Sequence, residues 1–253
     1  MCVLALAWRA HPCWRLVVAG NRDELHDRPS RPLERWDQPS HLIAGRDLRS
    51  GGSWLGVSEL GRFAVVTNLR GYGMPALGRA SRGSLVTSAL SGEDDCKLPD
   101  EAELARLNPF NLIVADRERA QFLSNRPSNV RRLLEPGIYG LSNGALDEPW
   151  PKTRLLKEML LKWLAGEATR PNELFDDLRN ENLPLAWARS ATPSDVPQEP
   201  PLSPIFIRNP VYGTRCSTVV AIDDRNQGII VERRYTPDGD PSGESALSFS
   251  WPG

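Results

Sequence analysis

The chain has 253 residues, enough to bury a sizeable core in one domain. Lys and Arg number 31 and Asp and Glu 32, and this balance excludes the basic field that draws proteins to nucleic acid or anionic membranes. No window has the apolar length of a membrane span or the features of a secretory signal. We therefore expect one cytoplasmic domain over residues 1–253, with no nucleic-acid partner and no transmembrane segment; a homo-oligomer is compatible with this composition.

Cysteine and histidine are both scarce. The four cysteines, Cys2, Cys13, Cys96 and Cys216, have no CxxC spacing, so they predict neither a disulfide framework nor a zinc site. The chain has only three histidines and no HExxH motif. We expect no metal and no cofactor, and any catalysis should use a base other than imidazole.

In chain order, the first predicted elements are strands paired as hairpins. Four pairs of apolar segments are each separated by a short polar turn. The pairs are residues 3–8 with 14–19, 54–57 with 62–67, 110–115 with 120–123, and 217–222 with 228–233. Because consecutive strands joined by tight turns run in opposite directions, the sheets should be mainly antiparallel.

Helices are predicted mainly in the middle of the chain. The clearest spans residues 151–165, with Pro151 suited to its first turn and Gly166 to the residue after its end. Residues 84–90 and, more weakly, 172–178 also fit helices. A Pro-rich polar run at 191–204 predicts an irregular excursion. Strands followed by helices and again by strands indicate an α+β fold with layered antiparallel sheets.

Cys2 follows the initiator methionine directly, which is an informative position for a nucleophile. A side chain this small permits removal of Met1, and Cys2 would then carry a free α-amine with a pKa of roughly 7.7–8.0. That amine can accept the thiol proton near neutral pH. The alternative is that Cys2 is a small buried residue at the start of an edge strand.

A polar tetrad, Asn21, Arg22, Asp23 and Glu24, follows the apolar residues 14–19. In a tight first hairpin, the end of the second strand lies beside Cys2. An arginine there lowers a thiol pKa and a carboxylate can orient an amine. The alternatives are a solvated loop with an ion pair, or a metal site formed by Asp23, Glu24, His26 and Asp27.

Several motifs together resemble the NRDE-motif family, which is also named for transport and Golgi organisation. They are Met1-Cys2, the tetrad at 21–24 followed by Arg28-Pro29, the run GGSWLG at 51–56, Thr67-Asn68, Ser142-Asn143-Gly144, and GTRCST at 213–218. The resemblance therefore covers most of the chain. It implies the four-layer αββα sandwich of N-terminal-nucleophile hydrolases, with a motif order similar to that of cysteine amidases such as bile-salt hydrolases and penicillin V acylases.

The resemblance also implies roles for individual residues. In the amidases an N-terminal cysteine attacks the amide, an arginine and an aspartate support it, an asparagine helps to hold the oxyanion, and a further asparagine and a late arginine complete the site. The matching residues are Cys2, Arg22, Asp23, Asn68, Asn143 and Arg215. The amidases space their arginine and aspartate three residues apart, whereas here the two are adjacent. Asn21 and Glu24 are therefore alternatives for one of these roles or for a substrate contact.

Each of the later residues also has a structural interpretation. The Asn68 amide could donate to an oxyanion or form a turn, and Asn143 precedes a glycine and could also form a turn. Arg215 could bind a carboxylate or form a structural ion pair. Trp54 could line an acyl pocket or belong to the core. Strand alternation turns Cys216 away from Arg215, which favours packing.

These observations lead to two hypotheses. The first is a cysteine amidohydrolase that cleaves a non-peptide C–N amide bond, with a small-molecule amide or acyl substrate. The second, implied by the family resemblance, is a binding or trafficking protein for haem or acyl-lipid metabolites without turnover.

Overall fold

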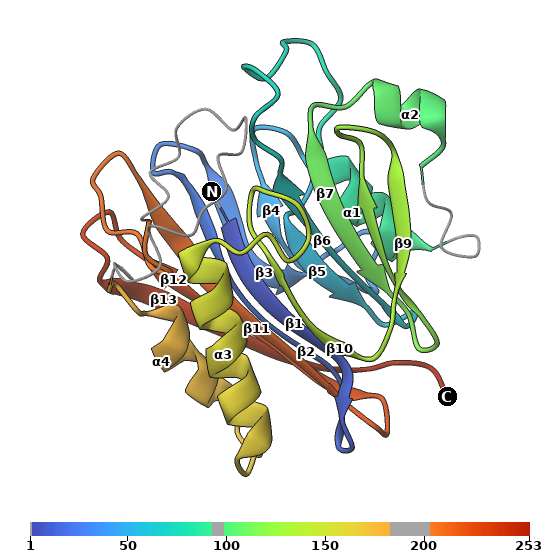
Figure 1. Ribbon diagram of the computed structural model, residues 1–253, viewed down its shortest axis with the longest axis vertical. Coiled ribbons are helices and arrows are strands. Elements are labelled where there is room, and N and C mark those ends of the chain that lie inside the picture. The colour runs from blue at the N-terminus through green and yellow to red at the C-terminus, as the bar shows by residue number, and fades with distance from the viewer. Residues whose placement is uncertain (1, 93–98, 183–202) are drawn as a thin grey trace.

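Two antiparallel sheets pack face to face in the computed structural model, which describes residues 2–92, 99–182 and 203–253 (Figure 1). The first sheet has the order β10-β1-β2-β11-β12-β13 and the second β3-β4-β5-β6-β7-β8-β9. The first sheet consists of β1 (Cys2–His11), β2 (Trp14–Leu25), β10 (Gly137–Leu141), β11 (Tyr212–Asp223), β12 (Gln227–Tyr235) and β13 (Pro241–Ser250). The second consists of β3 (Ser30–Arg35), β4 (Leu42–Asp47), β5 (Leu55–Ser58), β6 (Arg62–Asn68), β7 (Phe110–Ala115), β8 (Ala120–Ser124) and β9 (Val130–Leu134).

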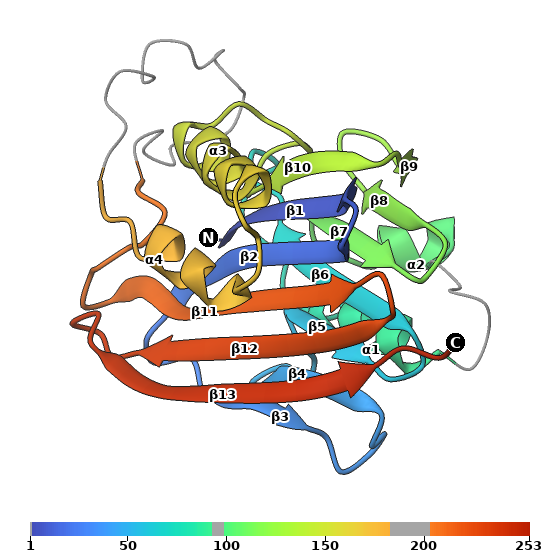
Figure 2. The same cartoon turned by 90° about the horizontal axis from the view of Figure 1, so that it is seen from below.

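Helices cover the outer face of each sheet and complete four layers. The helices α3 (Pro151–Ala165) and α4 (Leu174–Leu178) lie on the first sheet (Figure 2), and α1 (Gly83–Ser91) lies on the second, with α2 (Glu101–Ala105) contributing to the same apolar layer. Three apolar clusters separate the four layers. The expected αββα sandwich is confirmed.

Strand β1 shows how a strand of the first sheet is buried on two sides. Val3 and Ala5 belong to the cluster under α3 and α4, whereas Leu4, Leu6 and Trp8 face the second sheet. Because side chains alternate along a strand, a strand covered on both faces needs an unbroken apolar run. The same rule directs the side chain of Cys2, two residues before Leu4, toward the space between the sheets.

The four predicted hairpins are confirmed as β1-β2, β5-β6, β7-β8 and β11-β12. The tetrad at 21–24 differs from the prediction, because it does not follow a strand but belongs to one. Strand β2 continues to Leu25 since β11 pairs with it, with Asn21 opposite Ser217 and Glu24 opposite Gly213. The strands β3, β4, β9, β10 and β13 and helix α2 were not predicted.

The helices at 84–90 and 151–165 are confirmed as α1 and α3. The segment expected at 172–178 is divided into a 3-10 turn, Pro171–Glu173, and the short α4. Most of the excursion predicted at 191–204 lies outside the described residues. Within the described part of the chain, no helix combines the length and the apolar character needed to traverse a bilayer.

Candidate active site

Cys2 lies at the open end of the space between the sheets and lines a cavity of about 230 Å³. It is the first residue of β1 and pairs with Arg22 of β2, which in turn pairs with Cys216 of β11. Residues opposite one another on neighbouring strands point to the same face, so Arg22 lies beside the Cys2 thiol. The Cys2 side chain is half-buried, whereas Cys216 is buried.

The cavity draws its lining from distant parts of the chain. Of the residues singled out from the sequence, it is lined by Cys2, Arg22, Asp23, Glu24, Trp54 and Asn68. The first four come from the first hairpin, Trp54 from the loop before β5, and Asn68 from the end of β6. Residues 79–83, which lead into α1, form the opposite wall.

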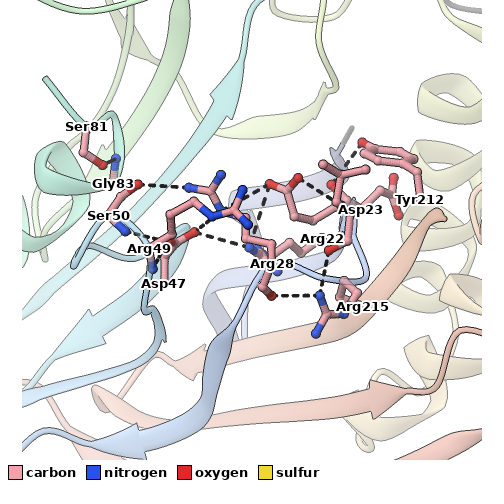
Figure 3. A network of polar contacts seen from close by, with 12 residues as sticks. Arg22, Asp23, Arg28, Asp47, Arg49, Ser50, Ser81, Gly83, Tyr212 and Arg215 are labelled. Carbon is pink, nitrogen blue, oxygen red and sulfur yellow. Dashed lines mark hydrogen bonds and ion pairs between the residues drawn. The ribbon is translucent and has the colours of Figure 1, made fainter. Parts of the chain in front are cut away.

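An ion-pair network joins β2 to the end of β4 beside the cavity (Figure 3). Arg28 Nε donates to Asp47 Oδ2 at 2.5 Å, and Arg22 Nη2 lies 3.5 Å from the same oxygen and 3.9 Å from Glu24 Oε2. Burial alone would raise the pKa of Asp47, but the hydrogen bond from Arg28 holds that pKa below its usual range. The Arg22 guanidinium also lies 4.3 Å from the centre of the Trp54 ring, so its position is fixed from several sides.

The surroundings of Cys2 disfavour the thiolate in the resting protein. Burial raises the pKa of the thiol and the charge of Asp23 raises it further, while the backbone N–H of Asp23 and the charge of Arg22 act in the opposite direction. The carbonyl oxygen of Cys2 is held by the Ser142 hydroxyl, which donates to it at 2.6 Å. A nucleophile at this position therefore needs a base to accept its proton.

The Asp23 carboxyl is buried at the same end of the sheet. Its Oδ1 accepts a hydrogen bond from the Thr214 hydroxyl at 2.6 Å. Burial raises the pKa of this carboxyl above its usual range. A buried carboxylate next to the start of the chain is suited to bind and orient an α-amine there.

Asn68 and Asn143 are joined to each other, but only Asn68 lines the cavity. Asn143 is buried, and its Nδ2 donates to the backbone oxygen of Asn68 at 2.6 Å. The N–H of Arg70 donates to the Asn143 carbonyl at 2.9 Å, so the link runs in both directions. The structure thus places Asn143 behind Asn68, where it fixes the end of β6.

Besides Asn143, two further predicted site residues, Asn21 and Arg215, lie outside the cavity lining. Asn21 Nδ2 donates to the carbonyls of Leu178 and Ile205 at 2.8 and 2.9 Å, which ties β2 to the helix layer. Arg215 donates to the carbonyls of Leu25 and Arg28 at 2.8 and 3.0 Å, and so supports the turn after β2.

Arg82 is a cavity residue that the sequence interpretation missed. It precedes α1, donates to the Pro109 carbonyl at 3.2 Å, and has no ion-pair partner among the described residues. Burial lowers the pKa of its guanidinium. The available signal was a pair of arginines, Arg79 and Arg82, just before a predicted helix; this pattern alone does not distinguish a cavity wall from an exposed turn.

The alternative metal site is not assembled in the described structure. The Asp23 carboxylate turns to Thr214, while the His26 ring contacts the Asn209 carbonyl at 3.0 Å. No group of three His, Cys, Asp or Glu side chains suited to a metal ion occurs among the residues described. The chemistry available at the cavity is that of a thiol, a buried carboxyl, an amide and a guanidinium without an ion pair.

Comparison with other proteins identifies relatives over nearly the whole chain. The model of the family described as Transport and Golgi organisation 2 matches residues 1–237. The human Transport and Golgi organization protein 2 homolog is 32% identical, over 92% of each chain. The Drosophila melanogaster Transport and Golgi organization protein 2 is 27% identical, over 96% of this chain and 95% of the relative.

Solved structures with a similar fold are hydrolases of low sequence identity. A mutant of the conjugated bile acid hydrolase from Clostridium perfringens has a TM-score of 0.54 at 8% identity, covering 97% of this chain and 92% of that chain. A Caenorhabditis elegans ortholog of N-acylethanolamine-hydrolyzing acid amidase has a TM-score of 0.50 at 10% identity, covering 86% and 91%. These similarities establish the fold of N-terminal-nucleophile hydrolases for this chain.

Proposed function

From the premise that this chain belongs to the Transport and Golgi organisation 2 family, we propose that it hydrolyses a linear, non-peptide amide bond through an acyl thioester on Cys2. The observation that carries the proposal is the meeting of Cys2, Asn68 and Arg82 in one cavity. The names of the two structural neighbours, an acid amidase and a conjugated bile acid hydrolase, support hydrolysis as the reaction class.

The first half of the reaction forms the thioester. Once Met1 is removed, the α-amine of Cys2 accepts the thiol proton as the sulfur attacks the amide carbonyl carbon. The tetrahedral intermediate then collapses, the C–N bond breaks, and the departing nitrogen takes the proton from the α-ammonium group. Asp23 is the proposed residue that orients the amine of Cys2. Its carboxylate would stabilise the protonated α-ammonium form of that amine.

The second half returns the enzyme to its starting state. A water molecule attacks the thioester carbonyl while the α-amine accepts one of its protons. Collapse of this second intermediate releases a carboxylic acid, and the proton returns to the Cys2 sulfur. In both halves Asn68 is the proposed side-chain donor to the oxyanion, with Asn143 fixing its backbone at 2.6 Å. One such donor contributes about 3–4 kcal/mol of transition-state stabilisation in enzymes.

The charges in the cavity suggest that the substrate carries an anionic group. Arg22 and Arg28 are occupied by Glu24 and Asp47, so these four side chains largely neutralise one another. Arg82 has no such partner among the residues described, and it is partly buried. A guanidinium in this situation binds a carboxylate through charge-assisted hydrogen bonds.

The alternative function is binding of an acyl-lipid metabolite or haem without turnover. The raised pKa of the Cys2 thiol favours this alternative, because a protonated thiol with its amine blocked by Met1 is a poor nucleophile. The state of the amine therefore distinguishes the two functions.

The proposal is tested with chromogenic acyl anilides supplied as matched pairs, one member with a carboxylate on the acyl chain and one without. We expect release of the aniline by the wild-type protein and none by Cys2→Ala. Arg82→Gln should raise KM for the carboxylate member about tenfold and leave the neutral member unchanged. Arg49→Gln, on a neighbouring exposed turn, is the matched control. No turnover of any anilide by protein lacking Met1 would favour the binding function.

A further inference from the structure

A second cavity, of about 530 Å³, lies behind the wall that carries Asn68. Leu69 and Arg70 line this cavity, whereas the preceding Asn68 lines the cavity of Cys2. The wall between them is fixed by the hydrogen bonds that join Asn143 to Asn68 and Arg70. The volume is within the range of small-molecule sites, roughly 300–1,000 Å³.

The floor of this cavity includes part of a polar row that crosses three strands of the second sheet. Thr67, Asn111 and Ser124 are opposite one another on β6, β7 and β8, and all three are buried. Ile113 and Phe122, in the row two residues further along the strands, are apolar and belong to the core between the sheets. A buried polar row beside an apolar one requires hydrogen-bond partners.

One atom of this row has no partner. Asn111 Nδ2 donates to the Gly144 carbonyl at 2.7 Å, and because a carbonyl oxygen only accepts, this bond fixes the orientation of the amide. Asn111 Oδ1 is then left without a hydrogen-bond partner in the described structure, although the side chain is buried and lines the cavity. A buried acceptor in this state favours a ligand that brings an O–H or N–H group to it.

The rest of the lining combines apolar walls with a basic rim. Leu69, Phe122 and Leu146 provide apolar surface. The charged residues of the lining are three arginines, Arg70, Arg126 and Arg132, and one acid, Glu148. Arg132 is exposed and has no ion-pair partner among the residues the structure describes.

We propose that this cavity is a second ligand site, separate from Cys2, for a small amphipathic carboxylate. Its apolar body would pack on Phe122 and Leu69, its hydroxyl or N–H group would donate to Asn111 Oδ1, and its carboxylate would lie near Arg126 and Arg132. The proposal does not depend on the amide hydrolysis proposed for the other cavity.

The test uses 6-hydroxy-2-naphthoate, a rigid two-ring probe with a hydroxyl and a carboxylate at opposite ends, and follows its fluorescence on titration with the full chain. Binding should weaken about fivefold to tenfold for 2-naphthoate, which lacks the hydroxyl, and by a similar factor for 2-naphthol, which lacks the carboxylate. Arg132→Gln should weaken binding of the hydroxynaphthoate but not of 2-naphthol. Arg131→Gln, on the adjacent position of β9 and outside the lining, is the matched control and should bind as the wild type does.

Binding measurements on variants of the Cys2 cavity show which of the two cavities the probe occupies. Cys2→Ala and Arg82→Gln should leave the dissociation constant unchanged, which would support a separate site. The proposal is overturned if the wild-type protein does not bind the probe, or if the hydroxyl and Arg132 make no difference. Loss of binding in Arg82→Gln with retention in Arg132→Gln would also overturn it, because the probe would then occupy the Cys2 cavity.

Discussion

At the scale of single residues, two neighbours of Cys2 act on its thiol in opposite ways. Burial and the charge of Asp23 raise the pKa of the thiol, and Arg22 lowers it. Arg22 can act in this way because its guanidinium is held by Asp47, Glu24 and the Trp54 ring. The thiol is therefore protonated at rest and reacts only when a base takes its proton.

Because Arg22 and Asp23 shift the pKa of the Cys2 thiol in opposite directions, their substitutions should have opposite effects. Arg22→Gln removes a charge that lowers the thiol pKa, so alkylation of Cys2 by iodoacetamide at about pH 7 should be slower. Asp23→Asn removes the charge that raises it, so alkylation should be faster. Peptide mapping in a Cys13→Ser background measures the rate at Cys2 without interference from the exposed Cys13.

Arg22→Lys is the control for this pair, because it keeps the charge and should alkylate close to the wild-type rate. Equal rates for Arg22→Gln and Asp23→Asn would show that neither charge acts on the sulfur.

At the scale of elements, the cavity depends on the close approach of two loops. Gly52, in the loop after β4, lies against Gly83 at the start of α1. The backbone N–H of Ser53 donates to the Gly83 carbonyl at 3.2 Å. A Cβ added at Gly52 would lie 2.3 Å from the backbone carbon of Gly83, which is far inside van der Waals contact. Gly52 is therefore needed to seat the helix that follows Arg82 at the cavity.

Gly52→Ala should lower the free energy of unfolding by about 1–3 kcal/mol, the usual cost of overpacking a rigid contact. Urea unfolding followed by tryptophan fluorescence measures the change. Gly166→Ala is the matched control, since its added Cβ would come no closer than 3.4 Å to another residue. A Gly52→Ala variant as stable as Gly166→Ala would contradict the packing described at this contact.

Local sequence signals account for part of the fold. The hairpins and α3 were predictable because their apolar periodicity is local and their ends carry turn residues. Strands β3 and β9 were not, because β3 has a bulge and four of its six residues are polar or charged, and four of the five residues of β9 are exposed. The tetrad was placed after β2 for a similar reason: β1 ends opposite Arg22, and only pairing with β11, which starts at Tyr212, keeps Asp23 and Glu24 in the strand.

The part of the candidate site that sequence motifs place near the ends of strands was predictable. Cys2, Arg22 and Asn68 do meet at one cavity. Arg82 and Asp47 were missed, and Asn21 turns to the helix layer, because the positions of these side chains depend on contacts between segments far apart in the chain. The hydrophobic periodicity of the sequence does not indicate such contacts.

At the scale of the whole molecule, one buried carboxylate joins the two sheets. Glu232 of β12 is buried, and its Oε1 accepts a hydrogen bond from the Leu33 N–H of β3 at 2.9 Å. Burial raises the pKa of Glu232 above its usual range, despite this bond and the nearby Arg234. The folded protein thus binds the proton more tightly than the unfolded chain, so this residue contributes less stability as pH rises from roughly 4.3 through the raised pKa.

Glu232→Gln keeps an acceptor for Leu33 without the charge, so it should be more stable than the wild type at about pH 7. This difference should shrink as the pH is lowered to about 4. Urea midpoints across this range measure it. The control is Glu244→Gln, whose carboxylate forms an exposed ion pair with Arg233, and it should show no such gain. Loss of stability of Glu232→Gln at every pH would contradict this account of the sheet contact.

We propose that Cys2, freed of Met1, is an acyl-accepting nucleophile facing a cavity built from both sheets. The most direct measurement is the intact mass of the protein before and after brief reaction with a β-lactone, which transfers its acyl group to a reactive thiol. We predict a native mass that lacks one methionine and a single acyl adduct that maps to Cys2. An Ala residue inserted between Met1 and Cys2 should abolish that adduct. A native mass that retains Met1, or an adduct absent from Cys2 in the wild-type protein, would contradict the account.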